Sequence, residues 1–308
     1  MLRFYKNDLL NMKLSIAVIT WNRERQLIEA LQSCVNSVIP IDTQFVIIDN
    51  ASTDHTEEVV KEFFQRYKYE FIYEKMTKNL GVGRGRNYAY SKTKGDYVYF
   101  MDDDAYIDTK CPHFFKKAIE VFDSNPSIAT LTTQIYDLLW KSNRITNYGP
   151  LIKEDIRHCN MICGGSHFLS RSFFKNADPY FPNQYGYEEI LPSIRVIDAG
   201  YVNAFVESLL VIHNPLVNKW DFSNKSNEVI LIKAIAIPRA LKSKYYPMIT
   251  VPLVYAAYKF RCMKYLSRKQ RQQAAIMSKE ISNSYQFGKR ISLKAVLTMY
   301  KNFGFSIF

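Results

Sequence analysis

The sequence predicts an α/β protein with a mixed, mainly parallel sheet flanked by helices, and three observations favour this fold. Short apolar runs of strand length alternate with segments whose apolar residues recur at helical spacing. Polar residues directly follow three of these runs, where strands are expected to end. The chain has 308 residues, 47% of them apolar, which is enough to bury a large core. Strands that alternate with helices are typical of a parallel sheet covered on both faces.

The first expected strand is the continuous apolar run LSIAVIT, residues 14–20, and a helical pattern follows through Leu27, Ala30, Leu31 and Val35. The run QFVIIDN is a second buried strand that ends in Asp49. EFIYEK and GDYVYFMDDD are the third and fourth strands, and RGRNYAYSKT between them is a short helix.

The helix expected between the second and third strands begins in STDHTEEVVKEFFQRY. Ser52, Thr53 and Asp54 are residue types that cap helix N-termini, and acids follow them in the first turn. We expect Ser52 or Thr53, and not Asp49, to provide the cap.

In parallel sheets, ligands bind at the carboxyl ends of the strands. Three polar clusters lie at such ends, which predicts a binding site at one edge of the sheet. Within the third cluster, alternation along an extended backbone puts Asp102 and Asp104 on one face and Asp103 on the other. Such a pair of acids can hold a divalent cation, although a solvated turn explains an isolated triplet equally well. The clusters are Thr20-Trp21-Asn22, Asp49-Asn50 and Asp102-Asp103-Asp104.

The net charge of +12 is concentrated near the C-terminus. Residues 229–308 contain fifteen Lys or Arg and one acid, Glu280, whereas residues 1–228 are nearly neutral. This asymmetry predicts that the C-terminal region contacts an anionic partner, either a membrane surface or a nucleic acid.

The five cysteines form no CxxC pair, which favours free thiols in a reducing cytoplasm. The N-terminal residues lack the apolar run of a signal peptide. The longest apolar segment, residues 245–258, is too short to span a membrane and contains two prolines. We therefore expect a cytoplasmic protein, with peripheral contact at the inner face of the cell membrane as a role for the basic region.

Seven motifs follow one another in order: VITWNR, VIIDNASTDHT, NLGVGRGRNYA, GDYVYFMDDDA, GGSHFLSRSFF, YGYEEILPSIRVIDAGY and VIHNP. Over residues 14–215 they resemble the family-2 glycosyltransferases of the GT-A fold. The resemblance implies a bacterial, inverting enzyme that moves a sugar from a nucleotide diphosphate, UDP being favoured, to an acceptor hydroxyl. It implies Mn²⁺ or Mg²⁺ as cofactor, a glycan or lipid-linked acceptor, and a role in surface polysaccharide or glycolipid assembly, with no nucleic-acid partner.

The resemblance also divides the chain. It implies an N-terminal extension at residues 1–13 and a GT-A catalytic domain at 14–228, followed by the basic helical region at 229–308. Within the catalytic domain, residues 14–105 form the nucleotide-binding half and residues 106–228 the acceptor half.

The resemblance assigns roles to single residues. Asp49 is the residue that reads the base, Asp102 approaches the ribose, and Asp104 and His213 hold the metal. The GGS turn, Gly164, Gly165 and Ser166, faces the acceptor. The implied nucleotide-sugar contacts are Thr20, Trp21, Asn22, Arg23, Asp49, Asn50, Gly81, Arg86, Asn87, Asp102 and Asp103.

Two adjacent acids are candidates for the catalytic base. Alignment on AGY puts Glu189 at the base position, with Glu188 beside it and pointing to a different side. The sequence departs from the family pattern here, because Glu stands in place of the commoner Asp and Leu191 replaces a later acid. Pro192 favours the start of a helix close to this point.

Two other classes of protein share parts of this pattern. A nucleotidyltransferase also combines strands, glycines and paired acids, but the TWNRERQ segment lacks the Gly-rich loop expected after its first strand. A membrane- or nucleic-acid-binding module would account for the basic region alone, and that region contains no recognised nucleic-acid motif.

Overall fold

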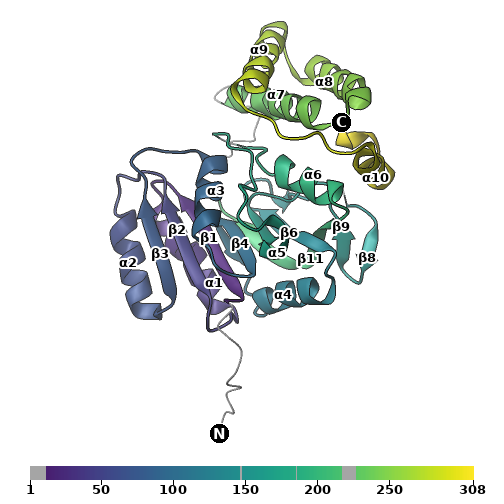
Figure 1. The fold of residues 1–308 in the computed structure, drawn as a ribbon. Helices are drawn as coiled ribbons and strands as arrows, with labels where there is room; N and C mark the ends of the chain where they lie inside the picture. Colours follow the sequence, from purple (N-terminus) through teal and green to yellow (C-terminus); the bar gives the residue numbers. More distant parts are fainter. Residues whose placement is uncertain (1–11, 146–147, 185, 217–226) are drawn as a thin grey trace.

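The computed structural model describes residues 12–145, 148–184, 186–216 and 227–308. Most of the predicted N-terminal extension, residues 1–11, therefore lies outside the described residues. One sheet forms the centre of the catalytic body, and the C-terminal helices pack at one end of it (Figure 1). The predicted α/β fold with a mixed, mainly parallel sheet is confirmed.

Residues 14–105 contribute four parallel strands in the order β3-β2-β1-β4. β1 and β2 consist mostly of buried apolar residues, as expected for strands buried on both faces. All four strands predicted from the sequence are present. Their bounds are β1 Leu14–Thr20, β2 Gln44–Asp49, β3 Glu70–Lys75 and β4 Tyr97–Asp102.

The remaining strands extend the sheet in the order β10-β6-β11-β9-β8, with β10 antiparallel to β4 and to β6. β6 and β11 are parallel, so their carboxyl ends lie together. Two short strands lie off this path, β5 on β11 and β7 on β6. The bounds are β5 Ala105–Ile107, β6 Ile128–Asp137, β7 Ser142–Asn143, β8 Leu151–Lys153, β9 Ile156–His158, β10 Ser166–Ser170 and β11 Val202–His213.

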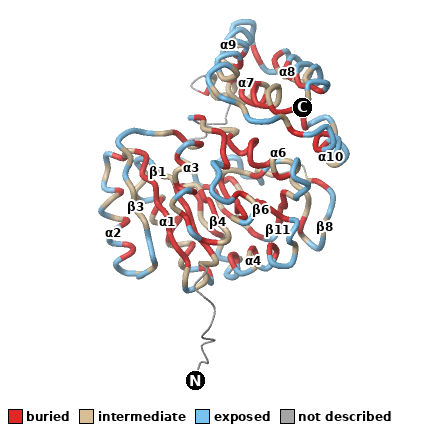
Figure 2. Tube along the Cα trace, in the orientation of Figure 1, coloured by how far each residue is buried: buried red, intermediate tan, exposed pale blue. Residues whose placement is uncertain are grey.

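Helices cover both faces of the sheet. Apolar residues of α1, α2 and α4 pack on one face, and those of α3, α5 and α6 pack on the other. Buried residues therefore run through the middle of the body (Figure 2). The bounds are α1 Glu24–Asn36, α2 Thr56–Tyr67, α3 Val82–Lys92, α4 Phe114–Ser124, α5 Arg171–Phe174 and α6 Ile190–Asp198.

The basic region is helical, as predicted, and part of it packs on the catalytic body. Ile237 and Leu241 share an apolar cluster with Ile190 and Ile194 of α6. Among the described residues, no helix has the length and apolarity needed to cross a bilayer. The bounds are α7 Glu228–Tyr245, η2 Met248–Thr250, α8 Val251–Tyr265, α9 Arg268–Ser284, α10 Leu293–Phe303 and η3 Gly304–Ile307.

The predicted cap of α2 is wrong. The helix begins at Thr56, and Asp54 Oδ1 accepts hydrogen bonds from the Thr56 backbone N–H and hydroxyl at 3.2 and 2.6 Å. Ser52 instead donates its backbone N–H to Asp49 Oδ1 at 2.7 Å. An extra turn therefore separates β2 from α2. The polar residues in this turn form hydrogen bonds with one another and with the backbone of the turn.

Candidate active site

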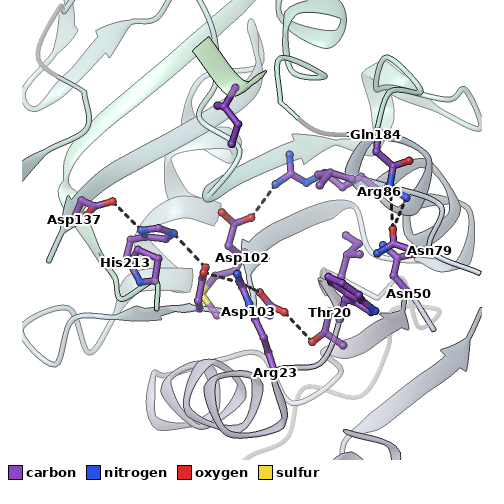
Figure 3. Close-up of a pocket in the computed structure, with 18 of the residues that line it drawn as sticks. Thr20, Arg23, Asn50, Asn79, Arg86, Asp102, Asp103, Asp137, Gln184 and His213 are labelled. Atoms are coloured by element: carbon purple, nitrogen blue, oxygen red, sulfur yellow. Dashed lines mark hydrogen bonds and ion pairs between the residues drawn. The ribbon is translucent and has the colours of Figure 1, made fainter. Parts of the chain in front are cut away.

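A pocket of about 430 Å³ opens at the carboxyl ends of β1 and β4. Polar side chains from several elements converge on it (Figure 3). Of the residues predicted from the sequence, ten line this pocket: Thr20, Trp21, Arg23, Asn50, Gly81, Arg86, Asp102, Asp103, Asp104 and His213. Trp21 is 53% exposed, so its ring is available to stack on a ligand.

The three consecutive acids do not alternate as a strand would place them. β4 ends at Asp102, and Asp103 and Asp104 lie in the turn that follows. The expectation that Asp103 opposes Asp104 is therefore wrong, because Arg23 Nη1 contacts Asp103 Oδ1 and Asp104 Oδ2, both at 2.6 Å. Thr20 Oγ1 also donates to Asp103 Oδ2 at 2.8 Å, which ties β1 to this turn.

Asp102, Asp104 and His213 form the only group of this kind found among the described residues that could hold a metal ion. One ligand atom from each lies within 4.8 Å of the others. His213 Nε2 is 3.2 Å from Asp104 Oδ1. Burial opposes ionisation of Asp104, but the hydrogen bond and charge of His213 and the charge of Arg23 outweigh it and lower the pKa of that carboxyl. Two carboxylates and one imidazole are a donor set that fits Mn²⁺.

Arg86 is buried and joins the two halves of the catalytic body. Its Nη2 atom donates to Asp102 Oδ1 at 3.0 Å and to the Gly164 carbonyl at 2.7 Å. Its Nη1 atom donates to Glu188 Oε1 at 2.6 Å and to Glu189 Oε1 at 3.0 Å. A Cβ atom on Gly164 would lie 2.0 Å from Glu189 Oε1, so the carboxylate needs glycine at this position.

The predicted divergence of Glu188 and Glu189 is wrong, since both carboxylates reach the same nitrogen of Arg86. The two residues lie in the chain just before α6, with Glu189 as its N-cap residue. Tyr187 has a φ of 66°, so the backbone turns sharply before them. Glu189 itself has helical φ and ψ of −72° and −14°, so the shared contact with the buried guanidinium, more than the local backbone, draws both side chains to one point.

Eight predicted residues do not line the pocket. Asp49 is fully buried, and its Oδ2 atom accepts the Tyr73 hydroxyl at 2.6 Å. Asn87 exchanges hydrogen bonds with the Tyr180 backbone, and Ser166 is buried within β10. Asn22 accepts the Thr53 backbone N–H at 2.7 Å. The others are Gly164, Gly165, Glu188 and Glu189, which lie around Arg86 or Asp102 beside the pocket.

The structure adds residues that the sequence reasoning missed. Asp137 and Arg144 line the pocket beside His213, and Lys233 reaches it from α7. Asp137 ends the strand IATLTTQIYD, so the strand-end rule that found Asp49 and Asp102 would have found it too. For Lys233 there was no such signal, because its position in the pocket depends on how α7 packs.

The sequence model of glycosyl transferase family 2 matches residues 15–176, more than half of the chain. The chain belongs to this family. The match includes the strand ends that carry Thr20, Asp49 and Asp102, and it stops before Glu189 and His213. The match therefore covers the first four strands and continues through β10 and α5.

Curated relatives of this family-2 chain match it over short segments. A poly(ribitol-phosphate) beta-glucosyltransferase of Bacillus spizizenii is 32% identical over 100 residues, covering 32% of this chain and 16% of the relative. The abequosyltransferase RfbV of Salmonella typhimurium is 38% identical over 96 residues, covering 30% of this chain and 29% of the relative. Most of each relative therefore lies outside the matched segment.

Solved structures extend the likeness to most of the fold. TarS of Staphylococcus aureus, residues 1–349 with UDP-GlcNAc, superposes with a TM-score of 0.63 at 17% identity and covers 88% of this chain and 82% of that one. The mannosyltransferase PcManGT of Pyrobaculum calidifontis, with GDP-Man and Mn²⁺, gives a TM-score of 0.60 at 14% identity and covers 94% and 79%. At these identities the likeness establishes the GT-A fold and nothing further.

The acids around Arg86 predict an unusual pH dependence of stability. Burial and the nearby charge of Glu189 raise the pKa of Glu188 to about 8, against the opposing effect of Arg86. Unfolding returns the carboxyl to its ordinary value of 4.5, so between these pH values the folded protein binds more protons than the unfolded chain. The free energy of unfolding contributed by Glu188 therefore falls as pH rises through this range.

We expect the melting temperature of the ligand-free protein to fall as the pH rises from about 5 to about 8, and Glu188→Gln to flatten this decline. Glutamine resembles the protonated acid in shape and cannot ionise. Glu120→Gln is the control, because Glu120 is an exposed residue of α4 and its loss should leave the slope unchanged. Equal slopes in the wild type and Glu188→Gln would contradict the assignment.

Proposed function

We propose that this protein is an inverting, metal-dependent glycosyltransferase that moves a sugar from a nucleotide diphosphate, UDP being favoured, to an acceptor hydroxyl. One observation carries the proposal. A member of glycosyl transferase family 2 brings two carboxylates and His213 together in a pocket at the carboxyl ends of β1 and β4. That edge of the sheet is where ligands bind in α/β folds.

Each side of the pocket suits a different part of the donor. Exposed Trp21 and the amide of Asn50 line it at the ends of β1 and β2, where a base and ribose would bind. Arg23, which is partly exposed in the pocket, offers a guanidinium group to a diphosphate. Arg86 would act on the donor by holding Asp102 in place. Asp49, which ends β2 directly before Asn50 of the pocket lining, stays our proposed base-reading residue.

Asp102, Asp104 and His213 would hold the divalent cation. When bound, Mn²⁺ supplies positive charge to the diphosphate as it leaves. The protein residues then hold the donor and exclude water, while a base removes the proton of the acceptor hydroxyl as its oxygen attacks the anomeric carbon. Attack opposite the leaving diphosphate inverts the configuration.

Glu189 is the proposed base. Arg86 Nη1 donates a hydrogen bond to its Oε1 atom at 3.0 Å and so helps to orient the carboxylate. The carboxylate occupies the space that glycine leaves at position 164, and we propose that the acceptor hydroxyl approaches it from the opposite side. The relatives that act on poly(ribitol phosphate) favour a cell-surface polymer or glycolipid as the acceptor, and a bacterial source is consistent with them.

Binding of the donor is tested by thermal shift with a panel of nucleotide sugars and Mn²⁺. A ligand at about a hundred times its dissociation constant adds about 2.7 kcal/mol to the free energy of unfolding. We expect a UDP-sugar to stabilise the protein only when Mn²⁺ is present, and Asp104→Ala to abolish that metal-dependent part. Asp123→Ala, a surface change, is the control. Undiminished stabilisation of Asp104→Ala in chelator would exclude the metal role.

The base is tested by comparing Glu189→Gln with Glu188→Gln. Glutamine keeps the size of the side chain and removes its basicity, so we expect Glu189→Gln to lower the transfer rate by about a hundredfold or more while donor binding survives. Glu188→Gln should mainly weaken acceptor binding. If Glu188→Gln abolishes transfer and Glu189→Gln does not, the two roles must be exchanged.

We further propose that α8 places the enzyme at an anionic membrane surface. Val254, Tyr258 and Cys262 bury one side of this helix, and the sequence expectation of an apolar face packed on the protein accounts for that side. The opposite side is also apolar, with Phe260 61% and Met263 63% exposed. Figure 2 shows this outer surface of the helical region as exposed.

Charge favours a membrane as the occupant of this outer face. Leu253, Phe260 and Met263 recur at helical spacing, and Lys259 and Lys264 lie on either margin of the stripe they form. Lysines beside an apolar stripe are typical of helices that lie in the interface of anionic membranes. The excess of fourteen positive charges in residues 229–308 adds long-range attraction.

We expect the full chain to bind vesicles that contain phosphatidylglycerol at low salt, and to bind neutral phosphatidylcholine vesicles weakly. Phe260→Glu should weaken that binding at least about tenfold, because burial of one aromatic side chain is lost. Ile41→Glu is the matched control, since Ile41 is 91% exposed on the catalytic body. Wild-type binding by Phe260→Glu, or equal binding to both kinds of vesicle, would overturn the proposal; self-association lost in Phe260→Glu would instead assign the stripe to a second copy.

A further inference from the structure

We propose that Asp137 is a positioning residue that fixes the tautomer of His213, so that Nε2 faces the metal with a free electron pair. This inference rests on the proposed metal site and adds a residue to it. Asp137 has 1% of its side chain exposed and belongs to no motif recognised in the sequence.

The sheet places Asp137 and His213 opposite one another. They are the last residues of the parallel strands β6 and β11, and they are register partners. The register shifts between Val206 and Leu210, and this bulge brings His213 opposite Asp137. Partners in parallel strands point to the same side of the sheet, so the carboxylate and the imidazole meet. Figure 3 shows the resulting chain from Asp137 through His213 toward the acids.

Distances assign the two ring nitrogens. His213 Nδ1 lies 2.9 Å from Asp137 Oδ2, and Nε2 lies 3.2 Å from Asp104 Oδ1. Both ring nitrogens thus face a carboxylate, and a carboxylate accepts hydrogen bonds. Asp104 belongs to the group that could hold the ion, so a bound cation would replace a proton between it and Nε2, whereas Asp137 lies outside that group and keeps its hydrogen bond with an Nδ1 proton. In the neutral imidazole this leaves Nε2 unprotonated, as a metal ligand must be.

Other contacts hold the Asp137 carboxylate in place. Its Oδ1 atom accepts the backbone N–H groups of Leu139 and Trp140, both at 3.0 Å. Its Oδ2 atom accepts from Arg144 Nε at 3.1 Å and Nη2 at 2.9 Å. The carboxylate therefore cannot rotate away from His213 without losing several hydrogen bonds.

Arg144 does not compete for the imidazole electron pair. Its Nη2 atom lies 2.7 Å from Nδ1 and 3.1 Å from Nε2. An atom at such short distances from both ring nitrogens lies over the face of the imidazole. It is therefore in line with the electron pair of neither nitrogen. Arg144 therefore adds positive charge beside His213, and Asp137 alone orients the Nδ1 proton.

Asp137→Asn removes the preference for a proton on His213 Nδ1 and changes the shape of the side chain very little. The fixed backbone N–H groups of Leu139 and Trp140 hold the amide oxygen at the Oδ1 position, whereas the longer Arg144 can move. The amide nitrogen then faces His213 Nδ1 and donates to it. The ring proton moves to Nε2, where it blocks the metal.

The test measures Mn²⁺ affinity by electron paramagnetic resonance in a double-mutant cycle on the full chain. We expect Asp137→Asn to weaken Mn²⁺ binding about 10–100-fold when His213 is present. In the His213→Ala background the same change should alter affinity by less than about twofold, because Asp137 acts through the ring. Asp123→Asn is the matched control, since Asp123 is an exposed residue of α4 that pairs with Lys13.

Equal loss of affinity in both backgrounds, or none in either, would overturn the inference. A measurement on the wild type covers the case in which Asp137→Asn does not fold. The ring ¹⁵N shifts of neutral, metal-free His213 should report a proton on Nδ1, and a proton on Nε2 would refute the assignment. Absence of Mn²⁺ binding by the wild type would refute the proposed metal site and leave the tautomer result to stand separately.

Discussion

A buried cation organises this protein. Arg86 is 4% exposed, and a guanidinium removed from water is stable only among groups that satisfy its charge and its N–H donors. It meets this need with Asp102 at the end of β4, the Gly164 carbonyl, and the two glutamates before α6. Loss of one partner from such a group typically costs about 3–5 kcal/mol, so the positions of these segments depend on one another.

The same requirement shapes the metal-binding side of the pocket. Acids crowded at a strand end repel one another unless cations separate them, and Arg23 lies between Asp103 and Asp104. Burial and the charge of Asp104 still raise the pKa of Asp103 to about 6, against the opposing effect of Arg23. Arg144 serves Asp137 in a similar way. Protein cations thus stabilise, in the metal-free site, carboxylates that a bound ion would otherwise neutralise.

The basic helical region is part of the enzyme as well as an attachment to it. Ile230 and Lys233 of α7 line the same pocket as the strand-end acids. Ile237 and Leu241, one and two turns further on, pack with α6, the helix that follows Glu189. Helix α7, which lines the pocket, is therefore anchored beside the proposed base. The next helix, α8, exposes apolar residues to solvent. The division at residue 228 stays a prediction about domains, and the packing couples the two parts.

The sequence alone determined the α/β fold and most of the pocket, because strand period and strand-end polarity are local properties. Strand-end polarity found Thr20, Asp102 and Asp104, and the resemblance to the family added Arg23 and His213. Only the tertiary structure decided which of these residues meet, since pairing across strands and charge balance around a buried guanidinium involve segments far apart in the chain. Glu188 and Glu189 converge on Arg86, and Asp137 reaches His213 through a register set by a bulge. Long-range packing, and no local pattern, brought Lys233 to the pocket.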